Sequence, residues 1–86
     1  MLNMDMFGHY RFFVRGEIKD LQAFTINLTW YHSALAEIGS IADDGIGGTT
    51  LNLIVKNPER EEDIRKICKD FGVIGFSSFE ELKEMA

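Results

Sequence analysis

The sequence predicts an α+β domain in which a four-stranded antiparallel sheet carries two helices on one of its faces. Three observations lead to this fold class. Residues 20–39 hold the longest run of helix-spaced apolar side chains. Residues 9–15 and 49–56 alternate apolar and polar side chains, as half-buried strands do. Asn57 and Pro58 then open a second helix, because asparagine is a good N-cap and proline is favoured at the first helical position.

The first strand is predicted at residues 9–15, where aromatic and β-branched side chains dominate. Alternation directs one set of side chains into the core and the other set to the opposite face of the sheet. The core set is Tyr10, Phe12 and Val14, and the other set is Arg11, Phe13 and Arg15. Residues 1–8 lack periodicity and are expected to form a flexible lead-in.

The helical stripe in residues 20–39 recurs at steps of three and four. It consists of Leu21, Phe24, Leu28, Tyr31, Leu35 and Ile38. Gly39 would end this helix as a C-cap residue. Such a helix spans about 30 Å at ~1.5 Å per residue, whereas the strands reach about 20–25 Å. We therefore expect its end, with Tyr31, Leu35 and Ile38, to overhang the sheet and meet a partner.

The alternative to an overhanging helix is a break near His32 and Ser33, after which the chain is extended. In either case Trp30 and Ile26 lie beside the stripe and need cover. The favoured cover is intramolecular, by the N-terminal arm or by the C-terminal segment. The alternative is a partner surface, because tryptophan is a typical interface anchor.

The second half of the chain is predicted to contain a hairpin, a helix and a last strand. A short strand at residues 40–44 leads through the glycine turn 45–48 into the strand 49–56. That strand directs Leu51, Leu53 and Val55 to the core and Thr50, Asn52, Ile54 and Lys56 to the other face. The second helix presents Ile64, Ile67, Cys68 and Phe71, and ends at Gly72.

Residues 73–76 form the last predicted strand. Ser78 and Glu81 have the spacing of a capping box, so a short helix is expected to run on to Met85. Its apolar side chains Phe79, Leu82 and Met85 would then cover Trp30 and Ile26.

The order strand, helix, strand, strand, helix, strand predicts a ferredoxin-like βαββαβ sandwich. The strand order would be 4-1-3-2, with the two most apolar strands at the centre. Both helices would cover one face of the sheet. The other face would be open, with Phe13 and Ile54 at its apolar centre.

Composition limits the classes of function. Eighty-six residues form one domain, residues 1–86, and a chain of this size gains stability from pairing. The net charge of −5 argues against binding to a nucleic-acid backbone. A single cysteine favours a reducing, cytoplasmic setting, and no apolar run is long enough to span a membrane.

From Arg15-Gly16 through Leu35-Ala36-Glu37-Ile38-Gly39 to Ser40-Ile41, the chain resembles the ACT domain, a ligand-sensing ferredoxin-like module. The family's Pro-Gly before the first helix is missing, and the first predicted helix is several residues longer. The family binds amino acids between paired domains. The resemblance therefore implies a homodimer and a possible small-molecule ligand. Its ligand-binding residues would be Gly16, Glu17, Gly39, Ser40 and Ile41.

Two classes of function follow. The first is a small, non-catalytic binding or regulatory module that acts through protein–protein contact as a homodimer. Its interface candidates are Arg11, Phe13, Arg15, Asn52 and Ile54 on the open face and Trp30, Tyr31, Leu35 and Ile38 on the long helix. The second is a small acidic inhibitor or immunity-type protein that blocks a basic site on another macromolecule.

Catalysis is not expected. An acylphosphatase has this fold and size, but Arg15 and Asn52, the nearest matches to its functional residues, lie on strands and not in a phosphate-binding loop. Cys68 belongs to an apolar stripe, and the histidines are isolated, so we expect no metal and no cofactor.

Overall fold

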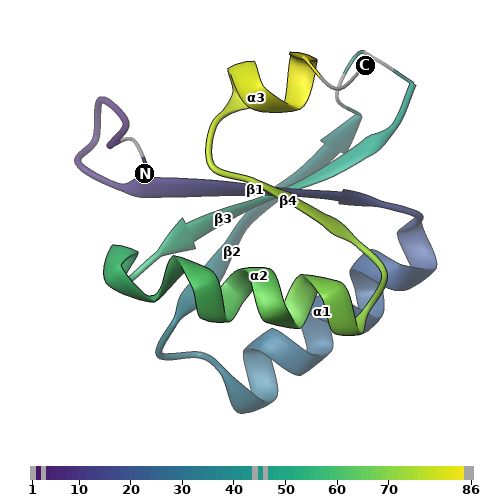
Figure 1. Ribbon diagram of the computed structural model, residues 1–86, viewed down its shortest axis with the longest axis horizontal. Helices are drawn as coiled ribbons and strands as arrows, with labels where there is room; N and C mark the ends of the chain where they lie inside the picture. The colour runs from purple at the N-terminus through teal and green to yellow at the C-terminus, as the bar shows by residue number, and fades with distance from the viewer. Residues whose placement is uncertain (1, 3, 44, 46, 85–86) are drawn as a thin grey trace.

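The computed structural model describes residues 2, 4–43, 45 and 47–84 (Figure 1). The element order is the predicted βαββαβ followed by a short helix. The strands are β1 (Tyr10–Gly16), β2 (Ala36–Asp43), β3 (Thr49–Val55) and β4 (Ile74–Phe76). The helices are α1 (Ile18–Tyr31), a 3₁₀ turn η1 (Pro58–Arg60), α2 (Glu61–Asp70) and α3 (Phe79–Glu84).

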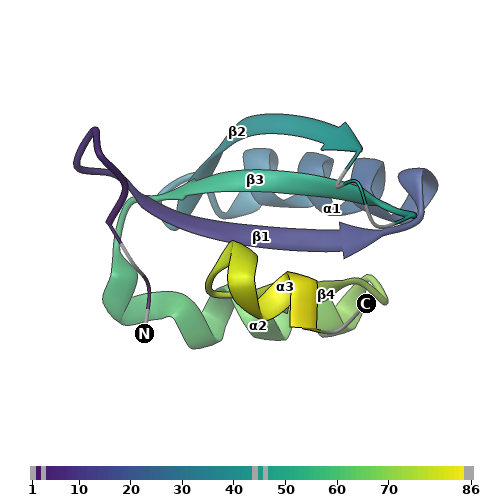
Figure 2. The ribbon, with the colours of Figure 1, turned by 90° about the horizontal axis from the view of Figure 1, so that it is seen from above.

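The sheet has the strand order β2-β3-β1-β4, and every pairing is antiparallel. This is the predicted ferredoxin-like order with β1 and β3 at the centre. Figure 1 shows α1 and α2 on one face of the sheet and α3 on the other. Figure 2 shows α1 beside the β2–β3 half of the sheet and α2 beside the β1–β4 half.

The core lies between the sheet and the two long helices. The side chains that the alternation along β1 and β3 assigned to the core are the ones that face these helices. Phe12 and Val14 of β1 are fully buried, as are most of the predicted core residues of β3. The remaining core side chains include Leu51, Leu53, Val55, Leu21, Phe24, Leu28, Ile64, Ile67 and Cys68. Gly72 ends α2 with a φ of 68°, as predicted for a C-terminal glycine.

The prediction of one continuous helix over residues 20–39 is wrong. Helix α1 ends at Tyr31, where the His32 N–H still donates to the Leu28 carbonyl. After one turn the chain enters β2, and the Lys56 N–H donates to the Leu35 carbonyl. The alternative, a break near His32, is therefore correct. The extended path gains a full row of hydrogen bonds with β3, whereas an overhanging helix would leave Leu35 in solvent.

Gly39, predicted as a helix C-cap, is instead the extra residue of a β-bulge in β2. Ile38 pairs with Leu53 and Ser40 pairs with Asn52, so Gly39 has no partner of its own. A Cβ at Gly39 would lie 2.9 Å from the Asn52 carbonyl oxygen, which explains the need for glycine. The bulge also shifts the alternation, so that Ile38 and Ile41 both face the helix layer.

The described residues of the N-terminal arm, 2 and 4–8, were predicted to be a flexible lead-in, and in the structure they fold back against the body. Leu2 is 5% exposed, and Met4 forms a bridge with Tyr10. The Asp5 N–H donates to the His9 carbonyl, so the arm folds back as a tight turn. The side chains at the tip of this turn, Met6 and Phe7, point into solvent.

Asp5 holds this turn together. Its Oδ1 accepts hydrogen bonds from the N–H groups of Phe7 and His9, and its Oδ2 lies 2.7 Å from Arg11 Nε. The hydrogen bond from His9 and then the one from Arg11 lower the pKa of Asp5 from 3.8 to about 2. A carboxylate with a lowered pKa stabilises the fold above pH ~4, and this contribution is lost as the pH falls through about 2.

We therefore expect Asp5→Asn to loosen the arm at neutral pH. The amide signals of Phe7 and His9 should move in NMR spectra toward random-coil positions, and the wild-type signals should move the same way only between pH 4 and pH 2. Asp70→Asn, at an exposed position on α2, is the control and should leave these signals in place. Unchanged Phe7 and His9 signals in Asp5→Asn would contradict this role.

The prediction that the C-terminal segment covers Trp30 and Ile26 on α1 is wrong for its described residues. The Phe79 ring lies 5.8 Å from the Phe13 ring, so α3 packs on the opposite face of the sheet. The predicted capping box is half present, because the Glu81 N–H donates to Ser78 Oγ while Glu81 Oε2 accepts from Ser77. Met85 lies outside the described residues.

Candidate functional site

The two loops expected from the ACT resemblance do not meet. Gly16 and Glu17 line a hollow of ≈ 430 Å³ together with the glycine-rich end of the β2–β3 hairpin. Gly39, Ser40 and Ile41 lie within β2 and do not line that hollow. Gly16 also has a packing role, since a Cβ there would lie 2.8 Å from Val73 Cγ1.

The face predicted to be open is partly covered by this chain's own segments. α3 lies over Phe13, and the N-terminal arm engages Arg11 through Asp5. All five interface candidates on this face are only half-exposed: Arg11, Phe13, Arg15, Asn52 and Ile54. A hollow of ≈ 340 Å³ remains between the arm and α3. The flat contact surface that the sequence suggested is therefore reduced.

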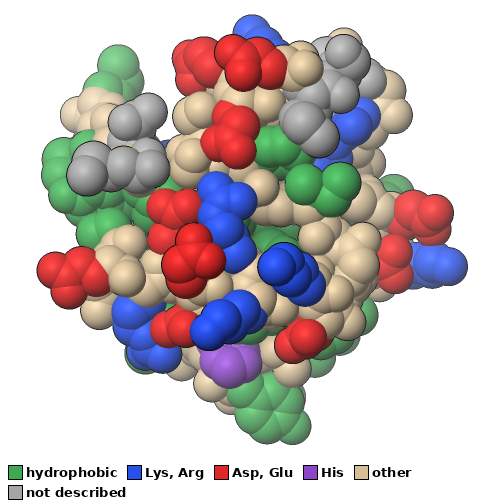
Figure 3. Space-filling view, in the orientation of Figure 1, with side chains coloured by type: hydrophobic (Ala, Val, Ile, Leu, Met, Phe, Trp, Pro, Cys, Tyr) green, Lys and Arg blue, Asp and Glu red, His purple; other side chains and the backbone are tan. Residues whose placement is uncertain are grey.

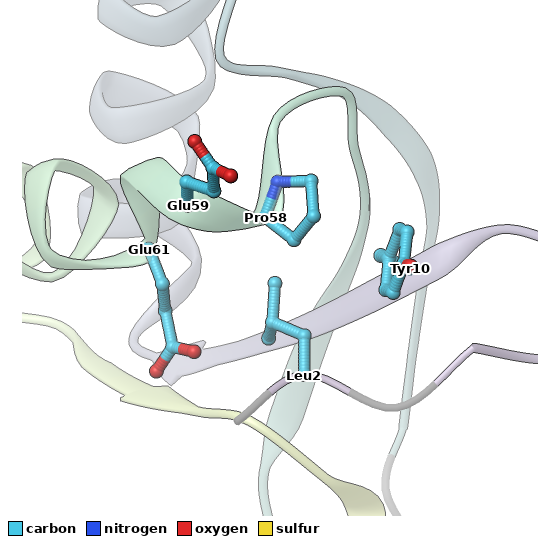
Figure 4. A pocket seen from close by; sticks show the side chains of 5 residues that line it. All are labelled: Leu2, Tyr10, Pro58, Glu59 and Glu61. Atoms are coloured by element: carbon cyan, nitrogen blue, oxygen red, sulfur yellow. The ribbon is translucent and has the colours of Figure 1, made fainter.

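A third hollow, of ≈ 400 Å³, lies between the arm and the start of α2 (Figure 4). The Leu2 side chain points toward Pro58 beside the ring of Tyr10. Glu61, at its rim, is paired with Arg65 at 2.8 Å. This hollow is the place where Leu2 of the arm lies beside the start of α2.

Five of the nine large apolar side chains that are exposed among the described residues lie on α1 or on the neighbouring strand β2. Trp30 and Tyr31 are each 77% exposed, Ile26 is 60% exposed and Ile41 is 52% exposed. We name Ile26, Trp30, Ile41 and the partly buried Ile38 the α1–β2 flank; Tyr31 follows Trp30 at the end of α1. Figure 3 shows hydrophobic side chains projecting at the bottom, where α1 ends in Figure 1.

A groove of ≈ 410 Å³ runs along this flank between the helix and the strand. Its walls are Gln22, Thr25, Ile26, Ile38, Ile41 and Leu51. Gln22, Ile26 and Trp30 follow each other at steps of four, so they form one ridge along the helix. The helix end at Tyr31 brings Leu35 into the core at 2% exposure, and the proposal that Leu35 meets a partner is wrong.

The flank is also the uncharged part of an acidic molecule. Residues 21–36 contain no Asp, Glu, Lys or Arg, whereas seven of the ten residues of α2 are charged. Aromatic enrichment and depletion of charge are typical of the central part of a protein interface. This charge-free run is a signal in the sequence from which the surface could have been identified.

Three further properties of the described ranges bear on function: metal-binding groups, the reactivity of the thiol and membrane-spanning helices. No group of three or more His, Cys, Asp or Glu side chains is arranged to hold a metal ion there. Burial raises the pKa of the Cys68 thiol to about 12, so this side chain acts as a small hydrophobe. No helix in the described part of the chain is long and apolar enough to cross a membrane.

Comparison with known proteins adds no relative. No family model, no curated protein and no solved structure gives a significant match to this chain.

Proposed function

We propose that this protein is a small, non-catalytic interaction module that acts as a homodimer through the α1–β2 flank. The observation that carries this function is the pair Trp30 and Tyr31, each 77% exposed at the end of a helix that carries no charged side chain from Leu21 onward. Large aromatic side chains are the usual anchors of protein interfaces. Exposing them without a partner is unfavourable for a protein in water.

A second copy suits this flank better than a basic partner does. Two copies of a chain with a net charge of −5 repel each other, and the repulsion is weakest where few of the contacting side chains are charged. The alternative function, an acidic inhibitor, relies on the acidic groups at Asp43-Asp44, Glu59–Asp63 and Glu80–Glu84. Two of them are already paired within the chain, Glu61 with Arg65 and Asp63 with Arg60, each at 2.8 Å.

Ligand sensing of the ACT type stays a prediction, because the family binds its ligand between paired domains and the two groups of residues lie apart within one copy. The residues expected to bind the ligand, Gly16 and Glu17 on one side and Gly39 to Ile41 on the other, belong to separate parts of the molecule.

The homodimer is tested by sedimentation equilibrium of the wild type and of two matched variants. Ile26→Asp adds a charge to the flank at a 60% exposed isoleucine and should raise the dissociation constant of the dimer at least tenfold. Ile74→Asp adds the same charge at a 53% exposed isoleucine on β4 and should change it less than twofold.

Two results would count against this function. A wild-type protein that stays monomeric up to millimolar concentration has no homodimer. Equal weakening by Ile26→Asp and Ile74→Asp would mean that the flank is not the contact. A monomer that binds tightly to a basic protein, and loses this binding when the acids of α2 are neutralised, favours the inhibitor.

A further inference from the structure

We infer that the dimer forms by antiparallel pairing of β2 with β2 of a second copy, giving one continuous eight-stranded sheet. This inference rests on the proposed homodimer and specifies its geometry. Four observations support it: the state of the two sheet edges, the pattern of faces along β2, the position of its charges, and the groove beside it.

Of the two edges of the sheet, the β4 edge is occupied. β4 has only three residues, and the carbonyl oxygen of Gly75 accepts a hydrogen bond of 3.1 Å from Arg65 Nη1. The next N–H, that of Ser77, donates to Glu81 Oε2. A strand that added to this edge would have to displace both side chains.

The β2 edge is long and accessible. β2 has eight residues, and among the described residues it pairs with β3 alone. From Glu37 onward every residue of β2 is exposed except Ile38, which is half-buried. Such an edge offers a row of backbone N–H and carbonyl groups to another strand.

The bulge at Gly39 gives β2 a symmetric order of faces. Ala36, Ile38, Ile41 and Asp43 point to the helix layer, whereas Glu37, Gly39, Ser40 and Ala42 are on the other face. The sequence of faces along β2 is therefore the same when it is read from Ala36 or from Asp43, and its centre lies between Gly39 and Ser40. In a strand pair, opposed residues share a face. When β2 pairs antiparallel with β2 of a second copy about a centre between Gly39 and Ser40, opposed residues share a face at all eight positions. A twofold dimer requires such a self-complementary contact.

The same register separates the acidic side chains. It sets Glu37 opposite Ala42 and Asp43 opposite Ala36, so no carboxylate faces a carboxylate directly across the strands. A shift by one residue, centred on Ser40, would oppose Glu37 and Asp43. Like charges directly opposite each other destabilise a strand pair.

On the helix side, this pairing sets Ile38 of one copy opposite Ile41 of the other. Because α1 lies beside β2 (Figure 2), the two grooves would then join across the twofold axis and their walls would cover each other. A stable interface buries about 800 Å² on each partner, which is about 15% of the 5396 Å² surface of this chain. One strand edge alone supplies too little area, so the exposed side chains of α1 form the rest of the contact.

Cysteine cross-linking tests the pairing and its register. Glu37→Cys combined with Ala42→Cys puts cysteines on directly opposed positions, and the oxidised protein should run as a covalent dimer. Glu37→Cys combined with Asp43→Cys is the matched control and should stay non-covalent, because these positions are on different faces. Cys68 is 2% exposed and does not compete.

Amide hydrogen exchange by NMR supplies a second measurement. In the wild-type dimer, alternate amides of β2 should exchange at least tenfold more slowly than in the Ile26→Asp monomer, while the amides of β4 should not change. A dimer with unprotected β2 amides and no cross-link overturns the strand pairing and leaves the proposed homodimer intact. Cross-linking in both cysteine variants overturns the register, and a monomeric wild type overturns both proposals.

Discussion

Leu35→Ala is expected to lower the free energy of unfolding by about 2–5 kcal/mol, whereas Trp30→Ala should change it by less than about 0.5 kcal/mol. Leu35 is 2% exposed and packs in the core, while Trp30 is 77% exposed. A buried leucine leaves a cavity when it is truncated, and an exposed tryptophan leaves none. The sequence alone suggested the opposite ranking, with Leu35 on a projecting helix end and Trp30 covered.

The measurement is urea denaturation of both variants in the monomeric Ile26→Asp background, so that dimerisation does not enter the free energy of unfolding. Equal losses of stability in the two variants would contradict the finding that α1 ends at Tyr31, with Leu35 buried and Trp30 exposed. A loss confined to Trp30→Ala would mean that the helix continues and that the tryptophan is buried.

Gly75→Ala is the second substitution with a large expected effect, a loss of about 1–3 kcal/mol in the free energy of unfolding. A Cβ at Gly75 would lie 2.5 Å from Cζ of Phe12 and 2.7 Å from its Cε2. Phe12 is fully buried on the central strand, so its ring has no space to retreat. The added methyl group must move either the ring or β4.

A double-mutant cycle with Phe12→Leu isolates this contact. The smaller leucine removes the ring atoms that the new methyl group would meet, so the combined loss should be smaller than the sum of the two single losses by about 0.5–3 kcal/mol. Strictly additive losses would show that the cost of Gly75→Ala arises elsewhere, for example in the backbone of β4.

The proposed pairing of β2 would also solve a problem that this sheet creates. An exposed edge of eight residues beside an apolar groove is a site for uncontrolled association. A twofold contact closes after two copies and leaves only the β4 edges, which Arg65 and Glu81 occupy. Ile26→Asp is therefore expected to affect assembly without affecting the fold of the monomer.

Local sequence predicted most of the architecture. Phe12 and Val14 on β1 and the alternating leucines of β3 identified the core face, because the period of two depends only on the pleat of the strand. Gly72 at the end of α2 could also be predicted from the sequence, because a positive φ at a helix C-terminus is a local requirement that glycine meets. The helix was predicted to be too long, because Leu35 and Ile38 continue its apolar spacing although the chain leaves the helix before them and enters β2 at Ala36.

The sequence by itself predicted the order of elements, the strand order of the sheet and most of the side chains that fill its core, with Leu2 and Leu35 as exceptions. Tertiary structure decided where α1 ends, because hydrogen bonding of Ala36–Asp43 to Thr49–Val55 joins segments that are distant in the chain. It also decided which apolar side chains remain in solvent. The apolar face of α3 is visible in the sequence, but only its packing against Phe13 leaves Trp30 uncovered. Local periodicity specifies that a side chain needs a partner, and the three-dimensional arrangement specifies which one.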